Sequence, residues 1–181
     1  MKKAIFLDRD GTLIVDKIYL NDPDQIEYLP GVFEALRLLR DADFHFVVAT
    51  NQSGIPRGLV TLANLHETHR RIRFEFARHG VDFLSFHYAP FMTSYPHPLR
   101  KPNAGMILEA ARDYNIDLSK SWMAGDRMSD VEAGHRAGCR SILLGDQEPP
   151  DKFAHFKPPE IHTATLLEAA GQILKLEQNV S

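Results

Sequence analysis

The chain has 181 residues, with 21 lysines and arginines against 24 aspartates and glutamates, so its formal net charge is −3. We expect a single domain over 1–181 with a sizeable core. The near-neutral charge argues against general nucleic-acid binding, and the single cysteine excludes an intrachain disulfide and a zinc site built from several thiolates. Apolar runs are too short for a membrane-spanning helix or, at the start, a signal peptide. We therefore expect a cytoplasmic protein without membrane contact and, because no coiled-coil pattern is visible, a monomer.

Five short apolar runs alternate with helical patterns along the chain. Near-continuous apolar character is typical of strands that are covered on both faces. The predicted strands are 3–7, 44–49, 84–88, 121–124 and 140–144. The predicted helices are 32–39, 61–79, 105–114, 130–137 and 165–176, with Thr61 as a cap and glycines at 80 and 138 as stops. This alternation predicts a parallel sheet flanked by helices, that is, a doubly wound, Rossmann-like α/β fold.

Two connections do not fit the alternation. The segment 12–29 follows the first strand, and we expect it to be a hairpin or a flap. The segment 90–102 is a loop rich in proline and histidine. Two proline pairs, Pro149-Pro150 and Pro158-Pro159, predict an irregular stretch before the last helix rather than a domain boundary.

Polar side chains follow the predicted strands at the point where each strand ends. Because the carboxyl ends of parallel strands meet at one edge of a sheet, these side chains should lie close together. Carboxylates are hard ligands for Mg²⁺, and a lysine with small-residue turns suits a phosphate. The set therefore predicts a metal-assisted phosphoryl-transfer site. Its members are Asp8, Asp10, Thr50, Asn51, Lys101 and Asp126.

Each residue alone has a plainer explanation. The pair Asp8 and Asp10 is also what a turn cap looks like, and Lys101 is also what a solvated lysine before a proline looks like. Asp126 and Asp130 are acids of the kind that a helix start favours. Their joint occurrence at successive strand ends is what favours the site.

The motifs resemble those of the haloacid dehalogenase superfamily of aspartate-nucleophile phosphatases. An apolar strand followed by D-x-D-G-T is similar to its first motif, and Thr50, Lys101 and the G-D-x-x-x-D at 125–130 match the other three in order. The resemblance spans roughly 5–145 and implies a sheet of order 5-4-1-2-3. Neither gap between motifs has room for a large inserted cap domain.

The resemblance also implies roles. Asp8 would be the nucleophile and Asp10 the general acid and base. Mg²⁺ would be held by Asp8, the backbone carbonyl of Asp10 and Asp126, while Asp130 would orient this shell. Thr50, Asn51 and Lys101 would hold the phosphoryl oxygens.

The stretches FLDRDGT, TNQSGIPRG, RKP and GDRMSDVEAG are similar to one branch of the superfamily, which acts on heptose bisphosphates and histidinol phosphate. The branch implies a small phosphorylated sugar as substrate, with a heptose 1,7-bisphosphate cleaved at its 7-phosphate, in surface-polysaccharide precursor synthesis, as the first expectation. Histidinol phosphate or another sugar phosphate is the alternative, and an inactive phosphate-binding protein is the alternative of a different class. The residues expected to contact substrate or phosphate are Asp16, Tyr19, Thr50, Asn51, Gln52, Ser53, Arg57, Arg100, Lys101 and Arg127.

One departure from the branch lies in the loop before Arg100. Relatives in this branch carry a C-x-H…C-x-C zinc loop there, whereas Ala89 and Phe91 stand at the first two ligand positions of this chain. Only His97 and Leu99 lie near the second pair, and the nearby His87 belongs to a predicted strand. Two histidines without thiolates make a poor structural zinc site, so we expect no zinc. Prolines and the aromatic rings of Phe91 and Tyr95 should fix the loop instead.

Overall fold

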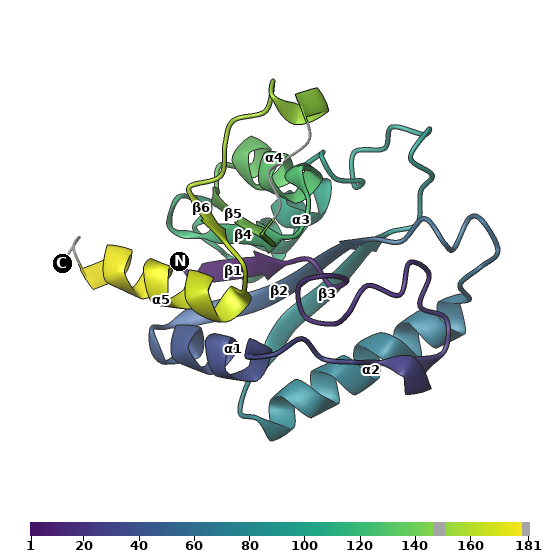
Figure 1. The fold of residues 1–181 in the computed structure, drawn as a ribbon, viewed down its shortest axis with the longest axis horizontal. Coiled ribbons are helices and arrows are strands. Elements are labelled where there is room, and N and C mark those ends of the chain that lie inside the picture. Colours follow the sequence, from purple (N-terminus) through teal and green to yellow (C-terminus); the bar gives the residue numbers. More distant parts are fainter. Residues whose placement is uncertain (147–150, 179–181) are drawn as a thin grey trace.

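A computed structural model describes residues 1–146 and 151–178. Over these residues, six parallel strands form one sheet in the order β3-β2-β1-β4-β5-β6 (Figure 1). The strands are β1 (Lys3–Leu7), β2 (Phe44–Asn51), β3 (Phe83–Ala89), β4 (Trp122–Gly125), β5 (Arg140–Leu144) and β6 (Ile161–Thr163). Since β1 pairs with both β2 and β4, the chain starts at the centre of the sheet and adds strands outward on each side. The predicted α/β class is confirmed.

The predicted strand order needs one correction. Read from its other edge, the sheet contains the expected order 5-4-1-2-3, but β6 continues it beyond β5. No sequence pattern indicated this strand, because its three residues, Ile-His-Thr, are too few to form an apolar run. It begins two residues after Pro158-Pro159, whereas Pro149-Pro150 lies outside the described residues.

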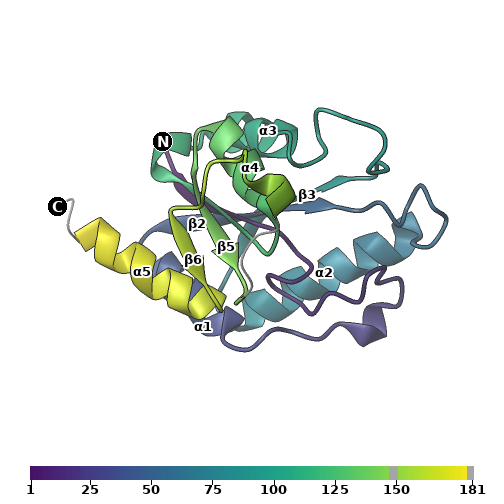
Figure 2. The ribbon, with the colours of Figure 1, turned by 45° about the horizontal axis from the view of Figure 1, so that its top comes forward.

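Helices cover both faces of the sheet. The helices α1 (Val32–Asp41), α2 (Leu62–Arg78) and α5 (Leu166–Gln178) lie on one face, and α3 (Gly105–Tyr114) and α4 (Met128–Ala137) lie on the other (Figures 1 and 2). Alternate residues of β1 serve the two layers: Ile5 and Leu7 pack with the first group of helices, and Phe6 packs with the second. Burial on both faces explains why the strands are almost continuously apolar.

Local signals set the helix ends. The Thr61 hydroxyl accepts a hydrogen bond from the Asn64 N–H at the start of α2, as expected of a cap. Gly138, with φ of 92°, ends α4 in a left-handed conformation that glycine adopts without strain. This helix begins at Met128, earlier than predicted, because the Asp130 carboxylate accepts the Arg127 N–H.

The segment 12–29 runs past the carboxyl ends of the strands as a long flap. It turns back on itself through one antiparallel bridge between Ile14 and Tyr28, and the Val15 N–H bonds to the Glu27 carbonyl. A short 3₁₀ turn at Pro23–Gln25 is the regular structure within it. The alternative of a two-stranded hairpin is not formed.

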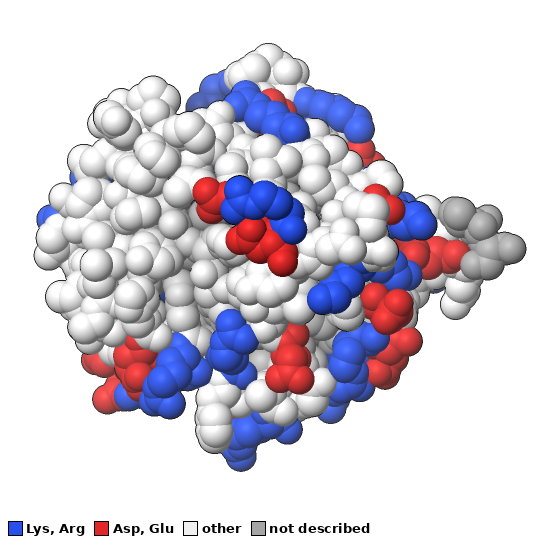
Figure 3. Space-filling model, turned by 180° about the vertical axis from the view of Figure 1, so that it is seen from behind, with Lys and Arg blue, Asp and Glu red and all other residues white. Residues whose placement is uncertain are grey.

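The charged side chains are mixed in sign. On the face seen in Figure 3, lysines and arginines lie beside aspartates and glutamates at the centre and along the lower and right-hand parts of the surface. Within the described ranges, no helix combines the length and the apolar character that crossing a membrane requires.

Candidate active site

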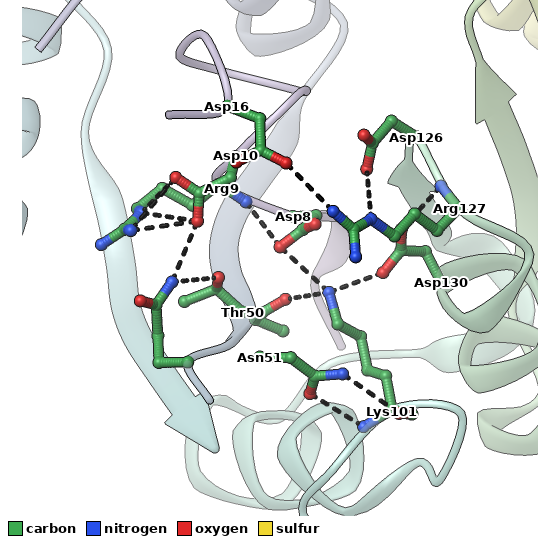
Figure 4. Close-up of polar contacts among 12 residues, drawn as sticks. Asp8, Arg9, Asp10, Asp16, Thr50, Asn51, Lys101, Asp126, Arg127 and Asp130 are labelled. Atoms are coloured by element: carbon green, nitrogen blue, oxygen red, sulfur yellow. Dashed lines mark hydrogen bonds and ion pairs between the residues drawn. The ribbon is translucent and has the colours of Figure 1, made fainter. Parts of the chain in front are cut away.

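The carboxyl ends of the central strands open into a cavity of about 1370 Å³. Thirteen of the fourteen predicted site residues line it. They are Asp8, Asp10, Asp16, Tyr19, Asn51, Gln52, Ser53, Arg57, Arg100, Lys101, Asp126, Arg127 and Asp130. The remaining one, Thr50, lies buried at the end of β2 and accepts a hydrogen bond from the Gln52 amide. The expected convergence at one sheet edge is therefore observed (Figure 4).

Lys101 lies at the centre of the polar cluster and is 3% exposed. Its ammonium contacts Asp8 Oδ1 at 3.0 Å and Asp130 Oδ1 at 2.6 Å, and donates to the Ala49 carbonyl at 2.7 Å. Burial alone would lower the pKa of this lysine, but the carboxylates of Asp130 and Asp8 outweigh burial and raise it. Lys101 is therefore a buried cation, and the plainer explanation of a solvated lysine is wrong.

The Asp8 carboxylate is held by one of its two oxygens. Oδ1 accepts the Arg9 N–H at 2.8 Å and contacts Lys101 Nζ. Oδ2 has no partner among the described residues. A carboxyl oxygen without a partner, beside a buried cation and at the wall of a cavity, is suited to attack an electrophile.

Asp126 and Asp130 differ in how their oxygens are used. Both oxygens of Asp130 have a partner, because Oδ1 contacts Lys101 and Oδ2 accepts a hydrogen bond from the Arg127 N–H. Asp126 Oδ1 is buried without a hydrogen-bond partner, and its nearest cation is Arg127 Nε at 3.9 Å. Burial, and then the charges of Asp130 and Asp8, raise the pKa of Asp126 to about 7.

This arrangement fits a divalent cation. One carboxylate oxygen from each of Asp8, Asp126 and Asp130 lies within 4.8 Å of the others. A buried carboxylate oxygen without a donor is the ligand type that Mg²⁺ takes. Two glycines leave room for these carboxylates. A Cβ atom at Gly11 would overlap Asp126 Oδ2, and a Cβ atom at Gly125 would overlap Asp130 Oδ2.

The Asp10 carboxylate points away from that of Asp8 and toward Arg9 (Figure 4). Both of its oxygens lie 3.0–3.2 Å from the Nε and Nη2 atoms of Arg9. Gln52 Nε2 donates to Asp10 Oδ2 at 3.0 Å and to Thr50 Oγ1. Burial raises the pKa of Asp10, while the charge of Arg9 opposes the rise.

Asn51 has a use that differs from the expected one. Its side chain bonds to the backbone of Lys101 at both ends, with Oδ1 accepting the N–H and Nδ2 donating to the carbonyl. This amide ties the end of β2 to the loop that carries the buried lysine.

Aromatic rings and an arginine hold the loop 90–100. Phe91 and His97 stack with their ring centroids 3.6 Å apart, and Tyr95 stacks on Phe91 at 6.1 Å. Arg100 donates to the Phe91 carbonyl and to the Thr93 hydroxyl. The sequence pointed to Phe91 and Tyr95, and the structure adds His97, which stacks closely on Phe91.

Three arginines lie around the mouth of the cavity. Burial, and then the charges of Arg127 and Arg57, lower the pKa of Arg100, so each of these two cations repels that of Arg100. Arg127 Nη2 contacts Asp16 Oδ2 of the flap at 3.0 Å, which joins the flap to the start of α4. An anion at this mouth would relieve that repulsion.

Two residues of the site were missed by the sequence. Arg9 is 1% exposed, and its Nη1 lies 3.3 Å from Nε2 of His69 on α2. An arginine between two acids at a strand end was a signal for a buried ion pair. His69 lies on a helix far along the chain, and no local pattern links it to Arg9.

Comparisons with known proteins give the class to which this fold, with its aspartates at the strand ends, belongs. A family model described as HAD-hydrolase-like matches residues 98–169. The chain is 38% identical over 150 residues to the D-glycero-beta-D-manno-heptose-1,7-bisphosphate 7-phosphatase of Pasteurella multocida, covering 80% of this chain and 82% of the relative. It is 33% identical over 157 residues to the corresponding alpha-heptose phosphatase of Campylobacter jejuni, covering 86% and 90%.

A solved structure is similar over nearly the whole chain. The D,D-heptose 1,7-bisphosphate phosphatase of B. bronchiseptica, complexed with magnesium and phosphate, gives a TM-score of 0.84 at 33% identity, covering 96% of this chain and 99% of that one. The chain therefore belongs to the haloacid dehalogenase superfamily, and it is a phosphoric monoester hydrolase. Within that superfamily it is similar to the heptose 1,7-bisphosphate phosphatases.

Proposed function

We propose that this enzyme removes the 7-phosphate of D-glycero-D-manno-heptose 1,7-bisphosphate in a Mg²⁺-dependent reaction, acting as a single-domain monomer. The observation that carries the proposal is the set of contacts around Lys101, which joins Asp8 to Asp130 beneath a cavity whose mouth carries three arginines. The names of the relatives supply the sugar.

Asp8 is the nucleophile in this proposal. Its Oδ2, which has no partner, attacks phosphorus, the bond to the sugar oxygen breaks, and an aspartyl-phosphate forms on Asp8. Asp10 gives a proton to the departing sugar oxygen, then takes one from the water that hydrolyses the aspartyl-phosphate. Lys101 holds Asp8 Oδ1 in place and offsets the negative charge that develops on the phosphoryl oxygens.

Asp8, the backbone carbonyl of Asp10 and Asp126 would hold the Mg²⁺ ion, while Asp130 positions Lys101 and the Arg127 N–H. We assign Asp126 rather than Asp130 to the metal because Asp126 Oδ1 has no hydrogen-bond partner, whereas both oxygens of Asp130 have partners. When bound, Mg²⁺ reduces the repulsion between the attacking carboxylate and the phosphate. Thr50 and Lys101 would hold the phosphoryl oxygens, and Asn51 would act by fixing the Lys101 backbone.

The arginines favour a substrate with two phosphates. Arg57 and Arg100 line the cavity together with Asp16, Tyr19 and Ser53, which would contact the sugar. A bisphosphate places a second anion at this mouth, whereas histidinol phosphate places an ammonium and an imidazole near the same cations. Electrostatics therefore favour the bisphosphate.

A substrate panel tests the proposal. The panel contains both anomers of the heptose 1,7-bisphosphate, histidinol phosphate and glucose 6-phosphate, each with Mg²⁺. We expect kcat/KM for one heptose anomer to exceed the values for the other compounds by roughly 100-fold or more. The substitution Arg57→Ala should lower kcat/KM for the bisphosphate more than for glucose 6-phosphate, whereas Arg70→Ala, on the exposed side of α2, should change neither. Equal and weak rates on all compounds would refute the heptose assignment.

Replacing the nucleophile tests the chemistry independently of the sugar. Asp8→Asn should abolish turnover of every compound, because an amide oxygen is a poor nucleophile and forms no stable acyl phosphate. The variant should still melt cooperatively, since the change removes one carboxylate from an acid-rich cluster. Retained Mg²⁺-dependent activity in this variant would contradict the role of Asp8.

A further inference from the structure

Asp10 is fixed by neighbours that the proposed chemistry does not use. Its carboxylate accepts from Nε and Nη2 of Arg9 on one side and from Gln52 on another. Arg9 in turn lies 1% exposed, with Nη1 at 3.3 Å from His69 Nε2. All the nitrogens of the Arg9 guanidinium are thus engaged, two with Asp10 and one with His69.

His69 is held as an acceptor for Arg9. Burial, and then the charge of Arg9, lower the pKa of His69 to about 3, so its ring is neutral at pH 7. Because a guanidinium only donates, the neutral ring accepts through Nε2. The ring packs between the layers, with Phe86 at 5.0 Å and Tyr88 at 6.3 Å between centroids, so β3 and α2 fix its orientation.

Stability alone does not explain this buried chain of polar groups. A buried ion pair contributes little net stability compared with apolar side chains of the same volume. The ion pair does, however, fix the orientation of the carboxylate, because a guanidinium that binds both oxygens of a carboxylate holds its plane in place. A general acid needs such orientation, since proton transfer depends on the placement of the donating oxygen.

We propose that Arg9, seated on His69, is the positioning residue that orients the Asp10 carboxylate for proton transfer to the leaving group. This inference rests on the proposed role of Asp10 as general acid and goes beyond it by assigning the residues that act through Asp10. Oδ1 accepts from Arg9 alone, whereas Oδ2 also accepts from Gln52, so we assign the transferred proton to Oδ1, the less occupied oxygen.

Two esters of different leaving-group basicity provide the test. Phenyl phosphate needs protonation of its leaving oxygen, whereas p-nitrophenyl phosphate has a far less basic one and needs little. The parameter kcat/KM reports the formation of the aspartyl-phosphate, the step in which the acid acts. We expect Arg9→Lys, which keeps the charge but not the planar fork, to lower kcat/KM for phenyl phosphate by about 10-fold or more. For p-nitrophenyl phosphate, kcat/KM should change by less than about threefold.

Variants at His69 separate positioning from folding. His69→Phe keeps a ring against Phe86 but has no acceptor, and it should show the same selective loss to a smaller degree. His69→Gln supplies an amide oxygen to Arg9 and should recover most of the phenyl phosphate activity. His66→Phe is the matched control, because His66 is exposed one turn earlier on α2 and contacts Tyr88, not Arg9. It should leave both esters unchanged.

Asp10→Asn distinguishes the inference from the function on which it rests. If Asp10→Asn loses phenyl phosphate activity selectively while Arg9→Lys and His69→Phe lower both esters equally or neither, the positioning role is refuted and the role of Asp10 stands. A rise in phenyl phosphate turnover in Arg9→Lys would likewise refute it, because Arg9 would then restrain the acid. If Asp10→Asn itself is not selective, both the acid assignment and the inference fail.

Discussion

At the scale of single residues, the surroundings of His69 make the stability of the protein depend on pH. The ring is buried and neutral in the folded state, with its pKa lowered to about 3 by burial and by Arg9. In the unfolded chain the same ring has its ordinary pKa of about 6.5. Below pH 6.5 the unfolded state therefore binds a proton that the folded state does not bind, and stability is lost as the pH falls from 6.5 toward 3.

This linkage gives a measurable prediction. Between pH 7 and pH 5, His69 should lower the free energy of unfolding by about 1–2 kcal/mol. His69→Phe removes this proton uptake, so its stability should fall less over the same interval, whereas His66→Phe should behave as the unchanged protein does. Urea unfolding at the two pH values measures the difference. Parallel pH profiles for the unchanged protein and His69→Phe would show that His69 titrates normally in the folded state.

The sequence predicted which residues meet better than what each one does. Strand-end position alone brought Asp8, Lys101 and Asp126 together, because parallel strands end at the same edge. It did not reveal that the Asn51 amide serves the Lys101 backbone, since side-chain direction depends on loops packed in three dimensions. The contact of His69 with Arg9 joins residues 60 positions apart and has no local signature.

At the scale of elements, the loop 90–100 shows how side chains can fix an irregular segment. Phe91, Tyr95 and His97 stack together as one cluster of rings, and the side chain of Arg100 closes the loop by donating to the Phe91 carbonyl. Aromatic pairs of this kind contribute about 0.5–1.5 kcal/mol beyond the burial of area. The stack therefore presents Arg100 to the cavity, where a substrate phosphate would arrive.

Removing the ring of Phe91, which stacks on both His97 and Tyr95, should loosen Arg100. We expect Phe91→Ala to raise KM for the bisphosphate by roughly 3- to 10-fold with little change in kcat, because the chemistry lies elsewhere. Tyr95→Ala, at the exposed end of the stack, should have a smaller effect. Steady-state kinetics gives both constants, and metal analysis completes the test. Stoichiometric zinc in chelator-washed protein would show that a metal, rather than the stack, shapes this loop.

Elements with strong periodicity were predicted closely, and short or irregular ones were not. The helix α1 buries Val32, Ala35, Leu36 and Leu39, which is the face that the spacing indicated. By contrast, β6 has only three residues and is stabilised by pairing with β5, a partner that no local pattern reveals. The same holds for the flap, whose one bridge joins residues 14 and 28.

At the scale of the whole molecule, the acidic cluster connects segments that are distant in sequence. Asp8 follows β1, whereas Asp126 and Asp130 follow β4, and their carboxylates crowd together with Lys101 as the cation among them. A divalent ion bound here would join the two halves of the sheet and, by binding only the folded state, would stabilise the entire fold.

Magnesium should therefore raise the melting temperature. At a concentration 100 times its dissociation constant, the ion would add about 2.7 kcal/mol to the free energy of unfolding. Asp126→Asn removes the carboxylate whose oxygen has no partner, so the shift should be lost in that variant. Calorimetry with and without Mg²⁺ measures the effect, and Asp117→Asn, in an exposed turn, is the control. An equal shift in Asp126→Asn would place the ion elsewhere.

The contact between Arg127 and Asp16 bears on the order of events during turnover. The guanidinium of Arg127 contacts the flap carboxylate through Nη2, so a phosphate that binds at this nitrogen has to displace that carboxylate. Exposed ion pairs of this kind contribute about 1 kcal/mol or less, so the ion pair between Arg127 and Asp16 breaks readily. Entry of the phosphate would free the flap, and departure of inorganic phosphate would let it close again. The binding of substrate and the release of inorganic phosphate, rather than the chemical step, would then set how long the flap stays open.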